Sequence, residues 1–284
     1  MRETCPVANE EQKRMWNEVN AARWVAVREA VDKSLAPFGK ATLDALAPAR
    51  GESALDVGCG FGATTLDLAA RVGPSGRVVG IDLSEPFLTR ARAAAPANVR
   101  YLCADAQTHA FDTVFDVCFS RFGVMFFEDP PAAFANLRRA LRPGGRFGTV
   151  VWASPRQNAW VDLPLRVVTS YLPPPPPASG PGPFSLADPA LLEQLLARAG
   201  FARPRVAPLA IPYLAGATPE DAARLLLQLG PAAAILREAG KAADPFRENL
   251  EADLREALAP FTSVRGVELP AMALLATAAQ DATG

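Results

Sequence analysis

The chain has 284 residues, of which 50% are apolar and 21% are charged, which excludes a disordered, collagenous or core-poor protein. This length suits two domains, or one α/β domain with an elaboration. With 29 basic and 30 acidic residues the net charge is −1, which gives no sign of a surface for nucleic acid or an anionic membrane, so we expect a small-molecule partner.

The N-terminal region predicts a helical lid over residues 1–40. Asn9 is followed three residues later by a glutamine, a capping-box pattern, and apolar residues then recur at helical spacing. We therefore expect a helix from residue 9 to about 35 that ends at Pro37, and a second helix over about 40–47.

The middle of the chain alternates between short apolar runs and helical patterns, as βα units do. Apolar strands separated by helices indicate a parallel sheet covered on both faces. The expected strands are Ser53–Val57, Arg77–Ile81, Val99–Cys103, Phe115–Phe119 and Arg146–Trp152, and the expected helices are 62–72, 85–95 and 130–141. We assign residues 41–153 to one α/β core that binds the cofactor.

The pattern is less regular after Trp152. Five consecutive prolines at 173–177 predict a stiff loop. The other expected elements are helices at 188–199, 218–229, 231–240 and 246–259 and strands at Arg205–Leu214 and about 266–277. Two late strands with helices between them indicate that residues 154–284 add a helix and edge strands to the core, with an inserted helical cap at about 215–262.

No targeting or membrane segment is evident, so we expect a soluble, cytoplasmic protein. The first residues contain no apolar stretch typical of a signal peptide, and the longest uncharged segment is broken by prolines. Scattered cysteines and a single histidine predict reduced thiols and no metal site. The cysteines are Cys5, Cys59, Cys103 and Cys118.

The first predicted strand leads through a glycine-rich loop, Gly58 to Gly62, into a helix. In an open α/β sheet such a turn lies at the carboxyl ends of the strands, where backbone approaches a ligand closely. Gly58, Gly60 and Ala63 also fit the dinucleotide pattern GxGxxA, and Asp82 has the spacing of a ribose-binding acid. The loop alone therefore leaves a nicotinamide cofactor open.

Three carboxylates accompany three successive strands. Asp56 precedes the loop, where a carboxylate suits a cationic ligand better than a pyrophosphate. Asp82 ends the second strand and Asp105 follows the third. Together they predict an acidic rim for a ligand with an ammonium group, a ribose diol and an exocyclic amine, which are the polar groups of S-adenosylmethionine.

At these residues the chain resembles the class I S-adenosylmethionine-dependent methyltransferases. The matching segments are Asp56–Gly62, Gly80–Ser84, Ala104–Ala106 and Leu141–Phe147. The helix with Trp16 and Trp24 and the run Ser120–Phe127 resemble the branch of ubiquinone/menaquinone-biosynthesis methyltransferases. The resemblance implies a doubly wound, Rossmann-like α/β fold with seven mostly parallel strands, the last of them antiparallel.

The resemblance also implies a cofactor site. Its roles are, in chain order, Asp56 near the cofactor ammonium, Gly58, Gly60 and Gly62 under the methionine moiety, Asp82 on the ribose hydroxyls, Leu83 against adenine, Asp105 on the adenine amine, the Ala106 N–H on a ring nitrogen, and Ser120 closing the site. Two further residues are candidates for catalysis. His109 is a general base if the acceptor must lose a proton, or else an ordinary loop residue, and Arg121 meets an anion or forms a structural ion pair.

Aromatic and sulfur-containing residues are candidates for the lid and the acceptor pocket. Trp16 and Trp24 lie eight residues apart, near one face of the predicted lid helix, where their rings suit a sulfonium cation. Phe122 and Met125 are candidates for lining the acceptor pocket. Ordinary core packing is the alternative for all four residues.

The expected function is methyl transfer from S-adenosylmethionine, with S-adenosylhomocysteine as product, by in-line displacement. A capped site favours a small acceptor that is apolar or aromatic, such as a secondary metabolite or a quinone-like molecule, over a macromolecule. An NAD(P)-dependent oxidoreductase and a non-catalytic S-adenosylmethionine-binding module are the alternatives. The oligomeric state is not predicted.

Overall fold

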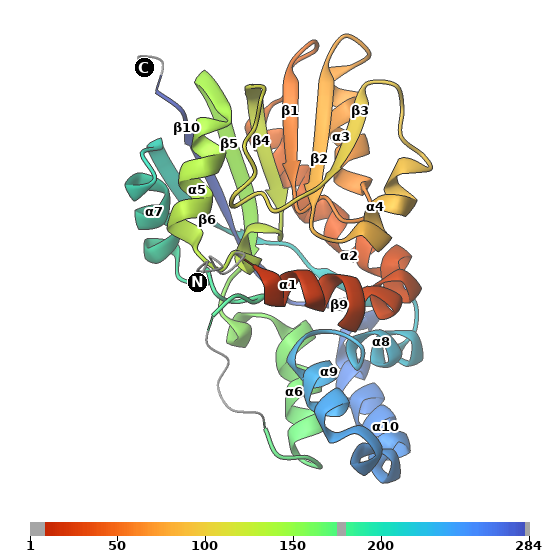
Figure 1. Cartoon of the computed structure of the whole chain (residues 1–284). Coiled ribbons are helices and arrows are strands. Elements are labelled where there is room, and N and C mark those ends of the chain that lie inside the picture. The colour runs from red at the N-terminus through yellow and green to blue at the C-terminus, as the bar shows by residue number, and fades with distance from the viewer. Residues whose placement is uncertain (1–8, 175–179, 282–284) are drawn as a thin grey trace, which may run out of the picture.

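A seven-stranded sheet organises the fold (Figure 1), seen in a computed structural model that describes residues 9–174 and 180–281. The strand order is β3-β2-β1-β4-β5-β10-β6. The strands are β1 (Ser53–Val57), β2 (Arg77–Asp82), β3 (Val99–Cys103), β4 (Phe115–Arg121), β5 (Leu141–Trp152), β6 (Ala202–Ala210) and β10 (Met272–Ala279). Neighbouring strands from β3 to β5 are parallel, whereas β10 is antiparallel to both β5 and β6. The expected fold class is confirmed.

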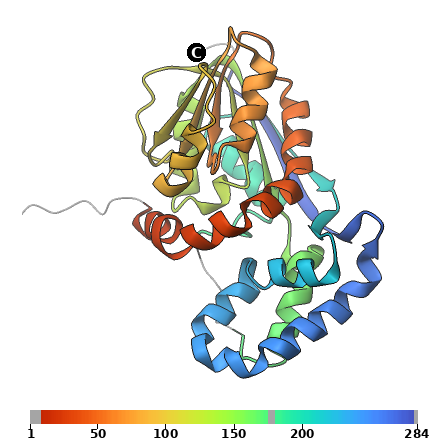
Figure 2. The same ribbon diagram turned by 90° about the vertical axis from the view of Figure 1, so that its right-hand side faces the viewer.

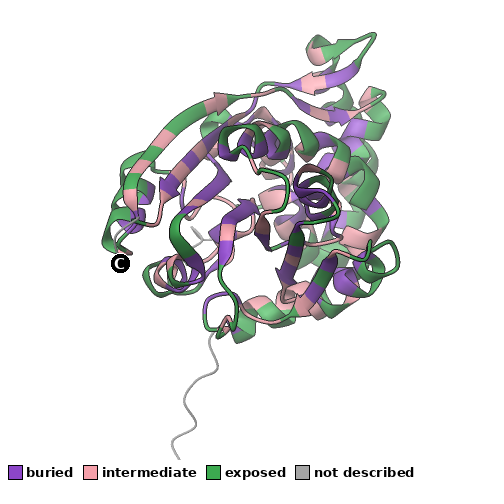
Figure 3. Ribbon diagram, turned by 90° about the horizontal axis from the view of Figure 1, so that it is seen from above, coloured by how far each residue is buried: buried purple, intermediate pink, exposed green. Residues whose placement is uncertain are grey.

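Helices cover both faces of this sheet. Alternate residues of β1 pack in opposite directions: Ala54 joins an apolar cluster with α2, α3 and α4, whereas Leu55 and Val57 join the larger cluster with α5 and α7. Figure 3 shows the buried interior between these layers. The helices are α2 (Ala21–Leu46), α3 (Ala63–Val72), α4 (Glu85–Arg92), α5 (Pro130–Arg139) and α7 (Pro189–Arg198).

The N-terminal helices run across the carboxyl ends of the parallel strands. They are α1 (Glu10–Arg14), a π-helical turn (Met15–Val19) and α2. The prediction that the helix ends at Pro37 is wrong, because α2 continues through it to Leu46. Pro37 has no N–H to donate to the carbonyl of Lys33, which is four residues earlier. Both residues are exposed, so water can solvate that carbonyl instead. Phe38 is fully buried beside Pro37, and its packing favours the continuous helix.

A second layer lies below the sheet (Figure 2), and the N-terminal helices lie between the two. It contains α6 (Ala159–Thr169), α8 (Pro219–Leu226), α9 (Gly230–Ala239) and α10 (Arg247–Leu258), and a small sheet of β7 (Tyr213–Gly216), β8 (Thr262–Ser263) and β9 (Gly266–Leu269). Short 3₁₀ turns lie at Val124–Phe126, Pro155–Gln157, Gly240–Phe246 and Ala259–Phe261.

Two predicted strands are each divided in the structure. Arg205–Leu214 contributes to β6 and β7, which belong to different sheets, and the break falls at Pro212. Residues 266–277 divide in the same way into β9 and β10 at Pro270. Proline has no N–H to donate to a sheet ladder, so each break falls where pairing is weakest. Helix α6, which has Pro164 in its middle, was not predicted.

Within the described residues, Cys59, Cys103 and Cys118 are free thiols, and Cys5 lies outside them. Part of the proline run, residues 175–177, also lies outside. The described helices include none with the length and apolar character to cross a membrane. In the same residues, no group of three or more His, Cys, Asp or Glu side chains is arranged to hold a metal ion.

Candidate active site

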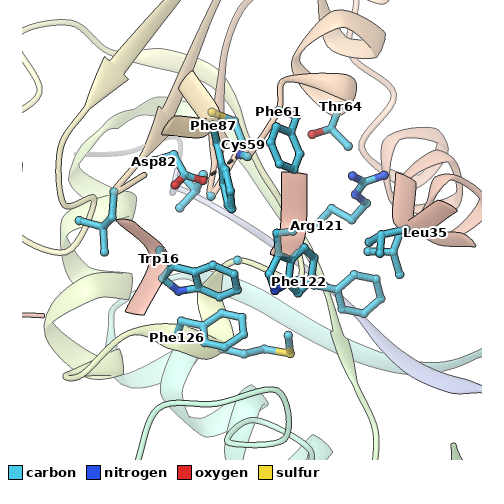
Figure 4. Close-up of a pocket in the computed structure, with 18 of the residues that line it drawn as sticks. Trp16, Leu35, Cys59, Phe61, Thr64, Asp82, Phe87, Arg121, Phe122 and Phe126 are labelled. Carbon is cyan, nitrogen blue, oxygen red and sulfur yellow. Dashed lines mark hydrogen bonds between the residues drawn. The ribbon is translucent and has the colours of Figure 1, made fainter. Parts of the chain in front are cut away.

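A cavity of about 230 Å³ lies between the carboxyl ends of the central strands and the N-terminal helices (Figure 4). Eleven of the residues singled out from the sequence line it: Trp16, Trp24, Gly58, Gly60, Asp82, Leu83, Asp105, Ala106, Arg121, Phe122 and Met125. Four others do not line it: Asp56, Gly62, Ser120 and His109.

The glycine loop forms one wall of the cavity. Gly58 has a φ of +68°, and a Cβ there would lie 2.8 Å from the Cα of Gly123, so backbone packs on backbone. Gly60 has a φ of +55°, yet a Cβ there would meet no atom within 4 Å. Packing therefore requires glycine at position 58. At position 60 the lack of a side chain leaves open space beside the cavity.

Asp82 organises the loops after β1 and β2. Its Oδ2 accepts the N–H of Gly60 and its Oδ1 accepts the N–H of Ser84, each at 2.8 Å. Burial raises the pKa of Asp82, and these two N–H donors oppose the rise. Its carboxylate oxygens retain lone pairs for a ligand in the cavity.

Asp105 is bound from the N-terminal segment. The side-chain amide of Asn9 donates to Asp105 Oδ2 at 2.8 Å, and the N–H of Gln107 donates to Asp105 Oδ1 at 2.9 Å. Asn9 also donates its backbone N–H to Glu128 Oε2 and accepts the N–H of Glu128. Asn9 is 2% exposed, so this network closes the β3 end of the cavity.

A second set of contacts fastens the π-helical turn to the loop after β2. Asn17 donates to the carbonyl of Leu83 at 2.9 Å and accepts the N–H of Glu85 at 3.0 Å. Ser84 donates its hydroxyl to the carbonyl of Trp16 at 3.0 Å. The lid is thus held by hydrogen bonds to the loops that carry the two acidic residues of the cavity.

Asp56 lies behind the cavity wall, on the side of the sheet that α3 covers. Its Oδ2 accepts the hydroxyls of Thr64 and Thr65, each at 2.7 Å, and its buried Oδ1 has no partner among the described residues. Burial raises the pKa of Asp56 to about 6, and the threonine hydroxyls and Arg121 oppose the rise. Thr64 lines the cavity, so it connects Asp56 to that space.

The other three residues outside the lining have different surroundings. Gly62 packs against Tyr101, whose hydroxyl would lie 2.3 Å from a Cβ. Ser120 is fully buried, donates to the carbonyl of Val57 at 2.8 Å and accepts the N–H of Gly123, so it joins β1 to the turn after β4. The His109 ring packs edge-on against Phe111 at 4.9 Å.

Aromatic side chains surround the space on the lid side. Trp16 makes edge contacts with Trp24, Phe87 and Phe126 at centroid distances of 5.4, 6.2 and 5.1 Å. Figure 4 shows Trp16 and Phe126 on one side of the cavity and Phe61 on the other. These faces suit a ligand that is apolar or cationic.

A second aromatic group lies toward β5. Trp160 stacks on Tyr213 at 5.3 Å, and Phe122 stacks on Trp152 at 4.2 Å. Burial raises the pKa of Tyr213 to about 12, so its hydroxyl stays protonated at neutral pH. The buried indole N–H of Trp160 has no acceptor among the described residues. This end of the cavity is therefore apolar, with a hydroxyl and an unpaired N–H donor nearby.

Arg121 ends β4 and lies at the cavity wall. One of its terminal N–H groups donates to Asp32 Oδ1 of α2 at 2.8 Å, and the Arg121 side chain is 12% exposed. An ion pair was one of the roles predicted for Arg121, and its partner is Asp32.

Several other lining residues were not identified from the sequence. They include Asn9, Asp32, Thr64, Trp152, Trp160 and Tyr213. Thr64 carried a local signal, since it lies in the first turn after the glycine loop. Trp152 carried one as well, since it ends the predicted strand Arg146–Trp152. The others come from segments whose approach to the loop depends on tertiary packing.

A family model described as a methyltransferase domain matches residues 55–149. Nocamycin O-methyltransferase of Saccharothrix syringae is 41% identical over 138 residues, which are 46% of this chain and 49% of that protein. Demethylmenaquinone methyltransferase of Staphylococcus aureus is 39% identical over 99 residues, 34% of this chain and 41% of that protein. The chain therefore spans about half or less of the length of these curated relatives.

Similarity to solved structures covers more of the chain. Phosphoethanolamine N-methyltransferase 2 of Haemonchus contortus, in complex with phosphomonomethylethanolamine and S-adenosylhomocysteine, matches with a TM-score of 0.52 and 20% identity. The match covers 86% of this chain and 52% of that one. At this identity the likeness shows a shared fold.

Proposed function

Residues 55–149 of this chain match a family model described as a methyltransferase domain, and from this premise we propose that the protein is an S-adenosylmethionine-dependent methyltransferase for a small, largely apolar acceptor. The observation that carries the proposal is one cavity with two chemically different ends. Asp82, beside Gly60, and Asp105 line its polar end, and aromatic rings line the other end.

The residues at the polar end fit the groups of S-adenosylmethionine. In the proposal Asp82 accepts the ribose hydroxyls, Leu83 packs on adenine, and Asp105 with the Ala106 N–H binds the adenine edge. The open space beside Gly60 admits the chain that follows the ribose. Gly62 and Ser120 act on this site through packing and backbone support, because they do not line the cavity.

The aromatic end supports an apolar or aromatic acceptor. Trp152, Trp160, Tyr213 and Phe122 present ring surfaces, and the Trp160 N–H is an unpaired donor. Relatives named for methylation of nocamycin and of demethylmenaquinone agree with a secondary metabolite or a quinone-like molecule. A cytoplasmic location and the absence of a nucleic-acid partner stay predictions from the sequence.

When bound, S-adenosylmethionine supplies a methyl group that its sulfonium already activates. The protein's contribution is then to hold the acceptor atom in line with that methyl and to exclude water. The lid serves the second task, since Asn9, Asn17 and Trp16 fasten it over the strand ends. No base is assigned: His109 lies outside the cavity lining, and its catalytic role stays a prediction.

The first test is calorimetric titration of the purified chain with S-adenosylmethionine, S-adenosylhomocysteine and NAD. We expect the first two to bind and NAD not to bind, whereas binding of NAD alone would support an oxidoreductase instead. The second test follows transfer of a labelled methyl group to a panel of phenols, quinols and aromatic amines. Binding of S-adenosylmethionine without transfer to any member would favour a non-catalytic binding module.

A further inference from the structure

One unpaired hydrogen-bond donor lies at the aromatic end of the cavity. Among the described residues, six buried side-chain nitrogen or oxygen atoms have no hydrogen-bond partner, and they belong to Arg23, Asp56, Tyr101, Arg138, Trp160 and Gln280. Of these six residues only Trp160 lines the cavity. Its indole Nε1 is buried, so water does not replace the missing acceptor. Because an unpaired buried donor is costly, a ligand that supplies an acceptor there gains affinity.

The start of α6 fixes the position of Trp160. Two residues before it lies Asn158, which is fully buried. The Asn158 amide donates to the carbonyls of Ser154 and Met272, each at 3.0 Å, and its Oδ1 accepts the N–H of Met272 at 3.1 Å. These bonds hold the start of α6 against the residues that follow β5 and the first residue of β10. Trp160 therefore joins the cavity wall from a rigid support.

Aromatic rings hold the indole itself. It stacks on Tyr213 at 5.3 Å with an interplanar angle of 19°, and it packs at a tilt against Trp152 at 5.0 Å and Phe184 at 6.3 Å. Trp160 is 7% exposed. The rings of Trp152 and Phe184 contain no hydrogen-bond acceptor, so this packing orients the indole without pairing its N–H.

The side chains at this end favour a methyl acceptor that carries oxygen. Phe122, Trp152, Trp160 and Tyr213 contain no carboxylate, amide or cationic group. An indole N–H only donates, so it pairs with a carbonyl, ether or phenol oxygen and not with the N–H of an amine. The raised pKa of Tyr213 keeps its hydroxyl protonated, as a second donor.

The strand order separates Trp160 from the adenosine site. Asp82 ends β2, and Trp152, against which Trp160 packs, ends β5. β1 and β4 lie between these strands, so three strand spacings of about 4.8 Å place Trp152 about 14 Å along the sheet from Asp82. In the proposed site Asp82 binds the ribose, to which the sulfonium of S-adenosylmethionine is attached. The Trp160 N–H therefore meets a part of the methyl acceptor that is remote from the reacting atom.

We propose that Trp160 selects the methyl acceptor by a hydrogen bond from its indole N–H to an oxygen other than the methylated atom. The substrate class that follows is a neutral aromatic molecule with a hydroxyl group and a second oxygen that accepts hydrogen bonds, such as a ring carbonyl. This inference rests on the proposed function and narrows its acceptor. Trp160 determines specificity and takes no part in the transfer of the methyl group.

The test uses two phenols that differ only in a carbonyl group, 7-hydroxy-1-tetralone and 5,6,7,8-tetrahydro-2-naphthol. Calorimetry measures the binding of each to the protein saturated with S-adenosylhomocysteine. Trp160→Phe keeps an aromatic ring and removes the N–H. We expect it to weaken binding of the ketone relative to the carbonyl-free phenol by about 2- to 10-fold, the range for one neutral hydrogen bond.

The control is Tyr171→Phe, which removes a hydroxyl just after α6 that donates to Asp253 Oδ2 at 2.7 Å, outside the cavity lining. It should leave the affinities for both phenols unchanged. Binding of S-adenosylhomocysteine shows whether each variant is folded. If Trp160→Phe does not fold, infrared spectroscopy of the unaltered complex decides: a hydrogen-bonded carbonyl absorbs at a lower wavenumber than the same ketone in hexane, and an unshifted band refutes the bond.

The outcomes separate this inference from the proposed function. If the unaltered protein does not bind S-adenosylhomocysteine, the proposed function fails. If it does, but Trp160→Phe weakens both phenols equally or neither of them, the cofactor site stands and the role of the Trp160 N–H is refuted. Failure of both phenols to bind the unaltered protein saturated with S-adenosylhomocysteine refutes the proposed class of acceptor.

Discussion

The side-chain amide of Asn9 donates to the carboxylate of Asp105 at 2.8 Å, which joins the start of the N-terminal lid to the loop after β3. The two residues are 96 positions apart in the chain, so this bond forms only in the folded molecule. Asp105 is also the residue proposed to bind the adenine amine. The hydrogen bond that holds Asn9 and the proposed adenine contact therefore use the same carboxylate.

We predict that Asn9→Ala loosens the lid. It removes the amide from Asp105 and the side-chain acceptor from the N–H of Glu128. Amide hydrogen exchange in residues 10–19 should accelerate on the order of tenfold, the equivalent of about one hydrogen bond to a charged group. Lys13→Ala, at an exposed position of α1, is the control and should leave exchange unchanged. Equal exchange rates in Asn9→Ala and the unaltered protein would show that the bond does not hold the lid.

Gly58→Ala and Gly60→Ala should have different effects although both glycines have positive φ. At Gly58 a methyl group meets the Gly123 backbone at 2.8 Å, so we expect a loss of about 2–5 kcal/mol in the free energy of unfolding. At Gly60 it meets no atom, so only about 1 kcal/mol of left-handed strain is expected, with a marked loss of S-adenosylhomocysteine affinity. Urea unfolding and calorimetry separate the two. Gly60→Ala with unchanged affinity would remove Gly60 from the ligand site.

Asp82→Ala and Asp105→Ala should each weaken S-adenosylhomocysteine binding by about 1–3 kcal/mol, because each leaves a buried polar group of the ligand without a partner. Asp82→Ala also removes the acceptor of the Gly60 and Ser84 N–H groups, so it should lower stability as well. Asp67→Ala, at an exposed position of α3, is the matched control for loss of a carboxylate. Unaltered affinity in both cavity variants contradicts the cofactor assignment.

The raised pKa of Asp56 makes stability depend on pH. Its value of about 6 in the folded protein lies above the ordinary value of 3.8, so folding favours the protonated form. This contribution to stability is fully present below pH 3.8 and is lost as pH rises through about 6, a change of about 3 kcal/mol. Asp56→Asn does not titrate, so in urea unfolding its stability should fall less than that of the unaltered protein across this range. Parallel curves for the two proteins would show that Asp56 does not titrate there.

Much of the core is predictable from the sequence because its signals are local. The strands Ser53–Val57 and Val99–Cys103 match β1 and β3 residue for residue, since short apolar runs are bounded there by loop residues. Asp82 and Asp105 reach the cavity because each lies where a parallel strand ends. A side chain at a strand terminus is placed by topology alone.

Other features depend on packing that local pattern does not report. Asp56 was expected near the ligand, but strand alternation sends it to the same face as Ala54, against the threonines of α3. Asn9 precedes α1 and Asp32 lies in α2, and both reach the cavity because long-range contacts hold these N-terminal helices over the sheet. The predicted helix end at Pro37 is wrong for the same reason, because the exposed position and the packing of Phe38 allow α2 to continue.

β10 is the last strand within the described residues, yet it lies inside the sheet between β5 and β6. During synthesis on the ribosome, β6 therefore has no partner in the sheet until residues 272–279 have emerged, whereas β1 to β5 can already pair with one another. Completion of the sheet thus follows the pairing of β1 to β5. A stop codon within β10 would detach β6 from the core rather than trim an edge.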